Sequence, residues 1–318
     1  MSGVKTLIEI LKNWRKYDEY KKDLTKLEFA KAAKKRIEEI YDDVEVTMKT
    51  VTKNNGVSLT GIAISVKDKN ETPIIYIDKA FCQYKAGKVS MEGVIQEIVE
   101  IYESSIIDNL PKSLLKSFYD FDKIKDKICF RLVNKELNLS LLEDTPHIIF
   151  QNDLAVIFYI LVKNAEDGIQ SITIKNSAMA LWDIDTMQLY DLAAENTRRI
   201  FGIKLMTIGD MLGQQFLNDL IEESPMYVAT NNECLFGANI MLYNDVLEEF
   251  ADKIGMDFYI IPSSVHECIF VPLNNNMDVS EIIKMIFEVN TTAVADEEVL
   301  SYSVYIYTKA DGQLTKYS

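Results

Sequence analysis

The sequence contains little of what small secreted proteins and fibrous proteins depend on. It has 4 cysteines, 6 prolines and 12 glycines among 318 residues, and no two cysteines have CxxC spacing. A chain of this length removes roughly three quarters of its surface from water on folding, so it does not need disulfides. We expect a cytoplasmic, globular protein with four reduced thiols, at Cys82, Cys129, Cys234 and Cys268.

Motifs that bind phosphate groups or metal ions are also missing. The sequence has no GxGxxG, GxxxxGKS, GxxxxGKT, HExxH or GxSxG pattern and no EF-hand loop. Its longest apolar run, residues 154–162, is 9 residues long. That is about half of what a membrane-spanning helix requires. The N-terminus lacks the continuous apolar stretch of a secretory signal. We therefore predict no cofactor, no metal site, no membrane span and no export.

Basic residues are too few to balance the acidic ones. The chain has 34 Lys and Arg against 49 Asp and Glu, which gives a net charge of −15. The first 38 residues carry a net charge of +5 and the remaining residues −20. An acidic body repels phosphate backbones, so we expect no direct binding to nucleic acid. The same charge allows a weaker alternative. In it, the acidic part of the chain after residue 38 mimics nucleic acid and blocks the binding site of a nucleic-acid-binding protein.

The first third of the sequence predicts helices around a small antiparallel sheet. Residues 3–41 have apolar side chains at spacings of three and four among lysines, which is typical of an amphipathic helix. The motif Asn54-Asn55-Gly56 lies between two β-type runs, 44–51 and 57–66, and predicts a tight hairpin. We expect a third strand at 73–77 and helices at 79–86 and 90–107.

The remaining sequence alternates short strands with helices. Strands are expected at 127–133, 147–150, 154–162 and 171–174, and the uniformly apolar run 154–162 predicts a central strand covered on both faces. Two helices follow, and the second spans 186–199 behind Asp185 as N-cap.

A pattern of two strands and a helix then occurs twice. The first copy has strands 226–230 and 236–242 and helix 246–254; the second has strands 257–261 and 267–271 and a helix capped by Asp278, with Glu281 completing a capping box. A last strand at 302–307 precedes a polar tail. Strand pairs joined by short turns favour an α+β fold, with antiparallel sheets and helices packed on one face. The expected domains are a basic helical extension (1–22), an N-terminal domain (23–120) and a C-terminal domain (121–318).

The strongest cluster of reactive side chains is Ser264, His266 and Cys268. If residues 264–270 form a strand, these three side chains share one face, because side chains alternate along a strand. His266 is then placed to activate Ser264 or Cys268 as a nucleophile. No orienting acid is evident, and Glu267 falls on the opposite face. The alternative is a structural histidine whose nitrogens are satisfied by hydrogen bonds.

Three further polar residues are weaker candidates for ligand binding. Arg198, at a helix end, has the geometry to clamp an anion, and Asn231 follows a strand where sites are often built. His147 precedes another strand, yet its spacing to His266 shows no metal-ligand pattern. Dipole complementarity and turn chemistry account for Arg198 and Asn231 without a ligand.

Several segments taken together resemble an uncharacterised bacterial family, domain of unknown function 5688. The resemblance covers roughly residues 23–310 and implies a bacterial, cytoplasmic, single-chain protein. It implies no activity. The segments that carry it are Asn54-Asn55-Gly56-Val57, Leu59-Thr60-Gly61-Ile62, Pro146-His147, Leu181-Trp182, Ala193-Ala194-Glu195-Asn196-Thr197, Met226-Tyr227-Val228, Thr230-Asn231, Gly237-Ala238 and Pro262-Ser263-Ser264-Val265-His266-Glu267.

The sequence predicts a non-catalytic module that binds a partner protein or a small ligand. This prediction rests on the missing phosphate, metal and nucleophile motifs. The alternative is a hydrolase or transferase that uses His266 with Ser264 or Cys268. An enzyme would require the imidazole to lie within hydrogen-bond reach of the nucleophile.

Overall fold

The computed structural model describes residues 24–41, 44–66, 74–107, 120–165, 168–207, 226–273 and 279–317. The chain forms two compact units, one of Met1–Lys53 with Val57–Lys112 and one of Asn54–Gly56 with Ser113–Ser318. Within the described ranges, no helix combines the length and apolar character needed to cross a bilayer. The predicted extension 1–22 and the predicted cap Asp278 lie outside the described residues.

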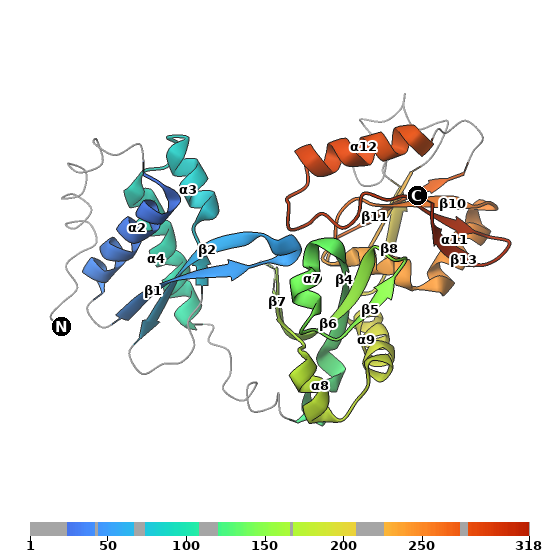
Figure 1. The fold of residues 1–318 in the computed structure, drawn as a ribbon, viewed down its shortest axis with the longest axis horizontal. Helices are drawn as coiled ribbons and strands as arrows, with labels where there is room; N and C mark the ends of the chain where they lie inside the picture. Colours follow the sequence, from blue (N-terminus) through green and yellow to red (C-terminus); the bar gives the residue numbers. More distant parts are fainter. Residues whose placement is uncertain are drawn as a thin grey trace. The chain divides into compact units, whose positions relative to one another are not determined.

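The first unit is a three-stranded antiparallel sheet with helices packed against it (Figure 1). The sheet order is β1-β2-β3. Fully buried side chains of α2, among them Phe29 and Ile37, pack against strand residues such as Ile62. The elements of this unit are α2 (Lys26–Ile40), β1 (Val44–Thr52), β2 (Ser58–Val66), β3 (Ile74–Tyr76), α3 (Asp78–Lys85) and α4 (Met91–Ile107).

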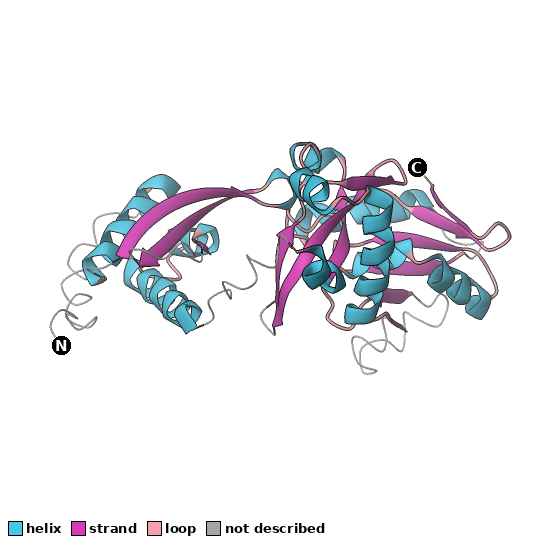
Figure 2. Cartoon of the chain, turned by 90° about the horizontal axis from the view of Figure 1, so that it is seen from below, coloured by secondary structure: helices cyan, strands magenta, loops and turns pink. Residues whose placement is uncertain are grey.

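Local sequence explains the start of α2 and the β1–β2 hairpin. The Thr25 hydroxyl accepts the Glu28 N–H, and the Glu28 carboxylate accepts the Thr25 N–H at 2.9 Å, so α2 has its own capping box. The predicted hairpin is confirmed. Asn55 and Gly56 have φ of 58° and 69° in the connecting turn η2 (Asn54–Gly56), and both conformations suit these residue types. Figure 2 shows the hairpin as a long twisted ribbon.

The second unit contains two antiparallel sheets. In the four-stranded sheet, β6 pairs with β4 along one edge and with β5 and β7 along the other. The six-stranded sheet has the order β13-β12-β10-β11-β9-β8. The elements are α6 (Phe121–Ile124), η3 (Lys125–Lys127), β4 (Ile128–Asn134), η4 (Glu136–Asn138), α7 (Leu139–Leu142), β5 (His147–Phe150), β6 (Leu154–Ala165), β7 (Gly168–Thr173), α8 (Asn176–Trp182), α9 (Thr186–Phe201), β8 (Lys204–Thr207), β9 (Tyr227–Thr230), η5 (Gly237–Leu242), α11 (Asn244–Ile254), β10 (Phe258–Pro262), β11 (Cys268–Pro272), α12 (Val279–Thr292), β12 (Tyr305–Thr308) and β13 (Gln313–Lys316).

Side-chain alternation divides each sheet of this unit into two covered faces. The central position of β6 is confirmed, and residues 154–160 are all buried. In the six-stranded sheet, Phe258 and Phe270 pack with Phe250 of α11, whereas Tyr259 packs with Ile282 of α12 on the opposite face. Helices therefore cover both faces of this sheet, whereas the sequence favoured helices on one face.

In the first of the two predicted strand-strand-helix copies, the prediction of the second strand, 236–242, is wrong. Residues 237–242 form the 3-10 helix η5. Phe236 precedes it with a left-handed φ of 54°, which ends any extended conformation. Asn239 of η5 is buried and bonds the backbone of β4. The segment therefore contacts the edge of the four-stranded sheet through a side chain and is not itself a strand.

Two side-chain amides take the place of a neighbouring strand at sheet edges. Asn239 accepts the Leu132 N–H at 3.0 Å and donates to the Phe130 carbonyl at 2.9 Å. Gln151 donates to the Leu314 carbonyl at 2.7 Å and accepts the Lys316 N–H at 3.0 Å. In both cases the amide bonds the C=O of one residue and the N–H two residues later, as a residue of a parallel neighbouring strand does. One N–H and one C=O at the edge of each of β4 and β13 are thereby satisfied.

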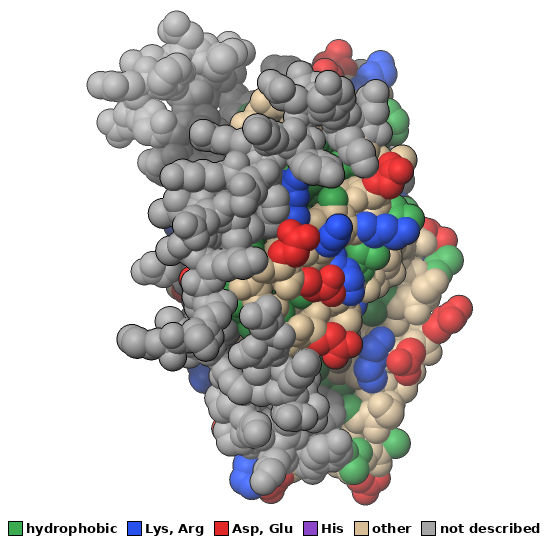
Figure 3. All heavy atoms as spheres, turned by 90° about the vertical axis from the view of Figure 1, so that its left-hand side faces the viewer, with side chains coloured by type: hydrophobic (Ala, Val, Ile, Leu, Met, Phe, Trp, Pro, Cys, Tyr) green, Lys and Arg blue, Asp and Glu red, His purple; other side chains and the backbone are tan. Residues whose placement is uncertain are grey.

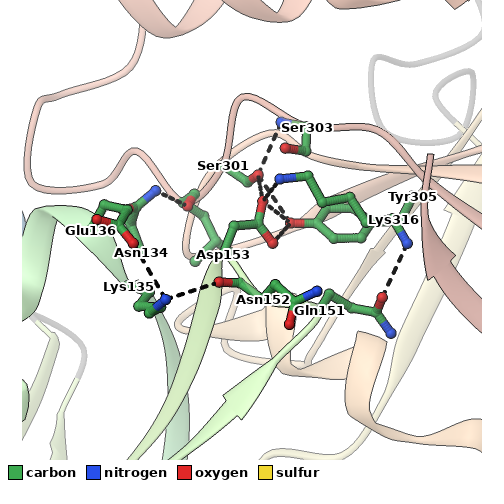
Figure 4. A network of polar contacts seen from close by, with 11 residues as sticks. Asn134, Lys135, Glu136, Gln151, Asn152, Asp153, Ser301, Ser303, Tyr305 and Lys316 are labelled. Carbon is green, nitrogen blue, oxygen red and sulfur yellow. Dashed lines mark hydrogen bonds and ion pairs between the residues drawn. The ribbon is translucent and has the colours of Figure 1, made fainter. Parts of the chain in front are cut away.

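Asp153 adds a carboxylate to the same turn as Gln151 (Figure 4). It accepts hydrogen bonds from the buried Tyr305 hydroxyl at 3.0 Å and from Ser301 at 3.2 Å, and it pairs with Lys316 at 3.1 Å. The turn between β5 and β6 thus binds the hairpin β12–β13 of the other sheet.

Asn239→Ala tests the edge function of the amide. The variant leaves an N–H and a C=O of β4 buried without partners, and we expect a loss of about 3 kcal/mol in the free energy of unfolding. Urea denaturation of the second unit measures it. Gln170→Ala removes an exposed amide from β7, and we expect that control to change stability by less than about 0.5 kcal/mol. Equal losses in both variants would contradict the role of Asn239.

Candidate ligand-binding site around Phe236

Residues 263–267 form the turn of the β10–β11 hairpin, so the strand expected over 264–270 begins only at Cys268. The Ser263 and Ser264 hydroxyls both donate to Oε1 of Glu267, at 2.7 and 2.8 Å. The Ser264 hydroxyl also accepts the His266 N–H at 2.9 Å. These bonds bend the chain back on itself, because a hydroxyl that bonds a backbone N–H two residues later stabilises a turn. Glu267 is therefore a partner of Ser264 after all, as an acceptor.

Both ring nitrogens of His266 have partners. Nδ1 accepts the backbone N–H of Phe236 at 3.2 Å, which assigns the imidazole proton to Nε2. Nε2 lies 3.5 Å from Oε1 of Glu298, whose side chain is 45% exposed. The ring also stacks on Phe236, with centroids 5.8 Å apart. Glu298 is the acid that the sequence did not reveal, since it comes from a distant loop.

Cys268 is enclosed at the start of β11. It is completely buried, its thiol lies 3.8 Å from the Ala238 carbonyl, and burial raises the pKa of the thiol well above its usual range. Ser264, His266 and Cys268 are thus neighbours in the sequence around one turn. The turn does not bring their reactive atoms together, because each side chain bonds a different partner.

Each of the three weaker candidates also has a partner within the protein. Arg198 pairs with Asp245 at 2.6 Å and is 47% exposed. The buried Asn231 side chain accepts the N–H groups of Glu233 and Leu235 and donates to the Leu235 carbonyl. Nδ1 of His147 lies 2.8 Å from the Thr145 carbonyl.

Phe236 is the residue around which the site is built. It adopts a left-handed φ of 54°, a conformation that costs a bulky residue of the order of 1–3 kcal/mol. The following Gly237 leaves no room for a side chain, because a Cβ atom there would lie 2.1 Å from the Thr230 hydroxyl and 2.4 Å from the His266 carbonyl. The Thr230 hydroxyl donates to that carbonyl at 2.7 Å. The strained loop is thus held against the 263–267 turn.

Arg131 of β4 lies beside Phe236. Its guanidinium carbon is 5.1 Å from the centroid of the Phe236 ring and 5.8 Å from that of Tyr159. Nε is buried without a hydrogen bond, and in the part of the chain that the structure describes Arg131 has no carboxylate partner. Burial lowers the pKa of the guanidinium, although an arginine remains charged in proteins.

Sequence reasoning missed Arg131, although a signal was available. The residue interrupts a mainly apolar strand, Ile128–Asn134. All the remaining residues of that strand are buried. Its cross-strand partner is Ile157, which is itself paired with His147 on the far side, so the three side chains form one row on the same face of the sheet. A charge at such a position requires a partner or a ligand.

Comparison with known proteins agrees with the resemblance noted from the sequence. The Family of unknown function (DUF5688) matches residues 26–309. The chain belongs to this family. No curated protein and no solved structure matches the chain. Membership in DUF5688 therefore gives the extent of the family match but no activity, and the chemistry of the site follows from its own residues. Among the described residues, no group of three His, Cys, Asp or Glu side chains is arranged to hold a metal ion.

Gly237→Ala tests whether the loop depends on close backbone approach. The added methyl group displaces Thr230 from the His266 carbonyl, and we expect a loss of about 3 kcal/mol or more in unfolding free energy. Gly255→Ala is the control, because Gly255 has a φ of 76° but nothing within 4 Å of the point where a methyl group would lie. We expect about 1–2 kcal/mol there from backbone strain alone. A smaller loss at Gly237 than at Gly255 would refute the packing argument.

The four thiols should differ in reactivity. Burial raises the pKa of Cys129 to about 11 and that of Cys268 well above its usual range, so at pH 8 about 0.1% of Cys129 is thiolate. Cys82 and Cys234 are exposed. We expect iodoacetamide to label Cys82 and Cys234 in the folded protein and to spare the other two, as peptide mass spectrometry would show. Rapid labelling of Cys268 in the folded state would restore it as a candidate nucleophile.

Proposed function

We propose that this chain is a non-catalytic binding protein of the bacterial cytoplasm, and that its second unit binds a small ligand beside Phe236. The observation that carries the proposal is the strained Phe236 backbone, held by the 263–267 turn next to an unneutralised Arg131. Strained residues are concentrated at ligand clamps and active sites, where the surrounding structure fixes them. The four unpaired cysteines support a reducing compartment.

Binding is favoured over catalysis by the hydrogen bonds of the turn. A hydrolase of the serine or cysteine type needs an imidazole lone pair aimed at its nucleophile. The lone pair of Nδ1 accepts the Phe236 N–H instead, and the proton on Nε2 faces Glu298. The Ser264 hydroxyl donates to Glu267, and the Cys268 thiol is enclosed. His266 in this arrangement positions Phe236.

The binding mode is favoured over nucleic-acid mimicry by the distribution of charge. A protein that mimics nucleic acid requires carboxylates along one face with few Lys or Arg side chains between them. On the face seen in Figure 3, Lys and Arg side chains are interspersed with Asp and Glu. Many of the described acids are also paired, as Asp245 is with Arg198 and Asp252 with Lys309.

A comparison of two phenylalanines tests the proposal. Purified full-length protein is unfolded, and the released small molecules are identified by mass spectrometry; the same molecules are then tested for thermal stabilisation of the folded protein. We expect Phe236→Ala to abolish this stabilisation. Phe287→Ala, which removes a ring that is 61% exposed on α12, should preserve it.

An enzymatic assay completes this test. Wild type and His266→Asn are incubated with ester, amide and phosphoester substrates, and we expect equal background rates. Turnover that disappears in His266→Asn would overturn the proposal in favour of a hydrolase. A wild type that releases no molecule and responds to none would favour a protein partner.

A further inference from the structure

We propose that the ligand carries a small oxyanion group, a carboxylate or a phosphate, which Arg131 binds. This inference rests on the proposed function, because it names the chemical class of the molecule that lies beside Phe236. The guanidinium offers planar, paired N–H donors that match the oxygen atoms of such groups. The site would therefore recognise the acidic end of a metabolite, with Phe236 and Tyr159 supplying aromatic surface for its remainder.

The surroundings of Arg131 explain why its charge calls for a partner. Four neighbours on the same face, Cys129, Val133, Ile157 and Tyr159, are each at most 1% exposed. Arg131 itself is only partly exposed, and a charge held among such buried residues carries a desolvation penalty unless it is paired. Contacts with the two aromatic rings stabilise the charge in part. The rings offset part of the penalty, and an oxyanion would offset the rest.

The buried hydroxyl of Tyr159 supports the same ligand class. It has no oxygen or nitrogen partner in the described ranges, and its ring is in contact with the guanidinium. The neighbouring Cys129 thiol is only a weak acceptor. Buried hydroxyl groups are almost always hydrogen-bonded in folded proteins. The ring that carries this donor contacts a cation without an anion, so a group that is negatively charged and accepts hydrogen bonds would suit both.

Arg198 provides the contrast. It has a cation–π contact with Tyr243, as Arg131 has with its two rings, but it is exposed and already pairs with Asp245 at 2.6 Å. A surface pair of this kind adds little to stability or binding. Of the two arginines in this unit that contact aromatic rings, Arg131 is the one whose charge is not neutralised by a described residue.

Four proteins and three probes test the inference. The proteins are wild type, Arg131→Met, Arg131→Lys and, as the matched control, Arg198→Met, all in the full chain. The probes are inorganic phosphate, benzoate and benzamide, each at millimolar concentration and equal ionic strength. Benzamide has the shape of benzoate without its charge. Thermal unfolding and calorimetric titration are the readouts, and circular dichroism confirms that each variant is folded.

We expect phosphate or benzoate to stabilise wild type and Arg198→Met, and benzamide to have a much smaller effect. Arg131→Met should weaken binding of the responding anion at least about tenfold, the loss expected for one charged hydrogen bond. Arg131→Lys should retain part of the binding, because it keeps the charge but loses the planar donor pair.

Two results would overturn the inference. One is an anion response that is equal in wild type and Arg131→Met, which would indicate an adventitious ion only. The other is a wild type that responds to neither anion. If benzamide or an extracted neutral molecule then stabilises wild type and requires Phe236, the small-ligand function stands and only the oxyanion class fails. If no molecule of any charge binds, both proposals fail together.

Discussion

The second unit depends on side-chain amides that act as substitutes for strands. Two sheets can share one unit only if their edges do not leave N–H and C=O groups buried without partners. Asn239 satisfies one N–H and one C=O at the edge of β4, and Gln151 does the same at the edge of β13, each by donating and accepting through the same side chain. A carboxylate of the same shape has no donor and would fail at either position. In a chain with a net charge of −15, these neutral amides are a specific requirement.

The same constraint places the candidate site. Because Asn239 must reach β4, the segment that carries it becomes a 3-10 helix, and the residue before that helix, Phe236, turns toward β6. The ring then lies over Arg131 and Tyr159 and against His266. Strain at one backbone position, a glycine without room for a side chain and an unneutralised cation occur within one small region. Their coincidence is what distinguishes this region from the hydrogen-bonded polar clusters elsewhere in the unit.

Most regular elements were predictable because they are fixed by local rules. The 147–150 strand and the helix behind Asp185 follow from apolar alternation and capping. The β8 and β13 strands were not predicted, since KLMT and QLTK are short, partly polar edge strands whose stability comes from distant partners. The expected strand at 236–242 failed for the same reason. Its apolar residues satisfy the alternation rule, but the conformation is decided by Thr230, His266 and β4. Among the site residues, His266 was found from residue type and Glu298 required the fold, whereas Arg131 was missed although its charge interrupts an apolar strand.

The turn between β5 and β6 also bears on how the molecule is made. Its Gln151 and Asp153 bond residues 305–316, and these partners are separated by 152 to 165 positions in the chain. Domains fold as units during translation, N-terminal ones first, and pairings this distant close late. The first unit can therefore reach its native state before the β12–β13 hairpin of the second unit has been synthesised. Until that hairpin emerges from the ribosome, the nascent second unit exposes an open sheet edge, and this is the interval in which it is most exposed to misassembly and proteolysis.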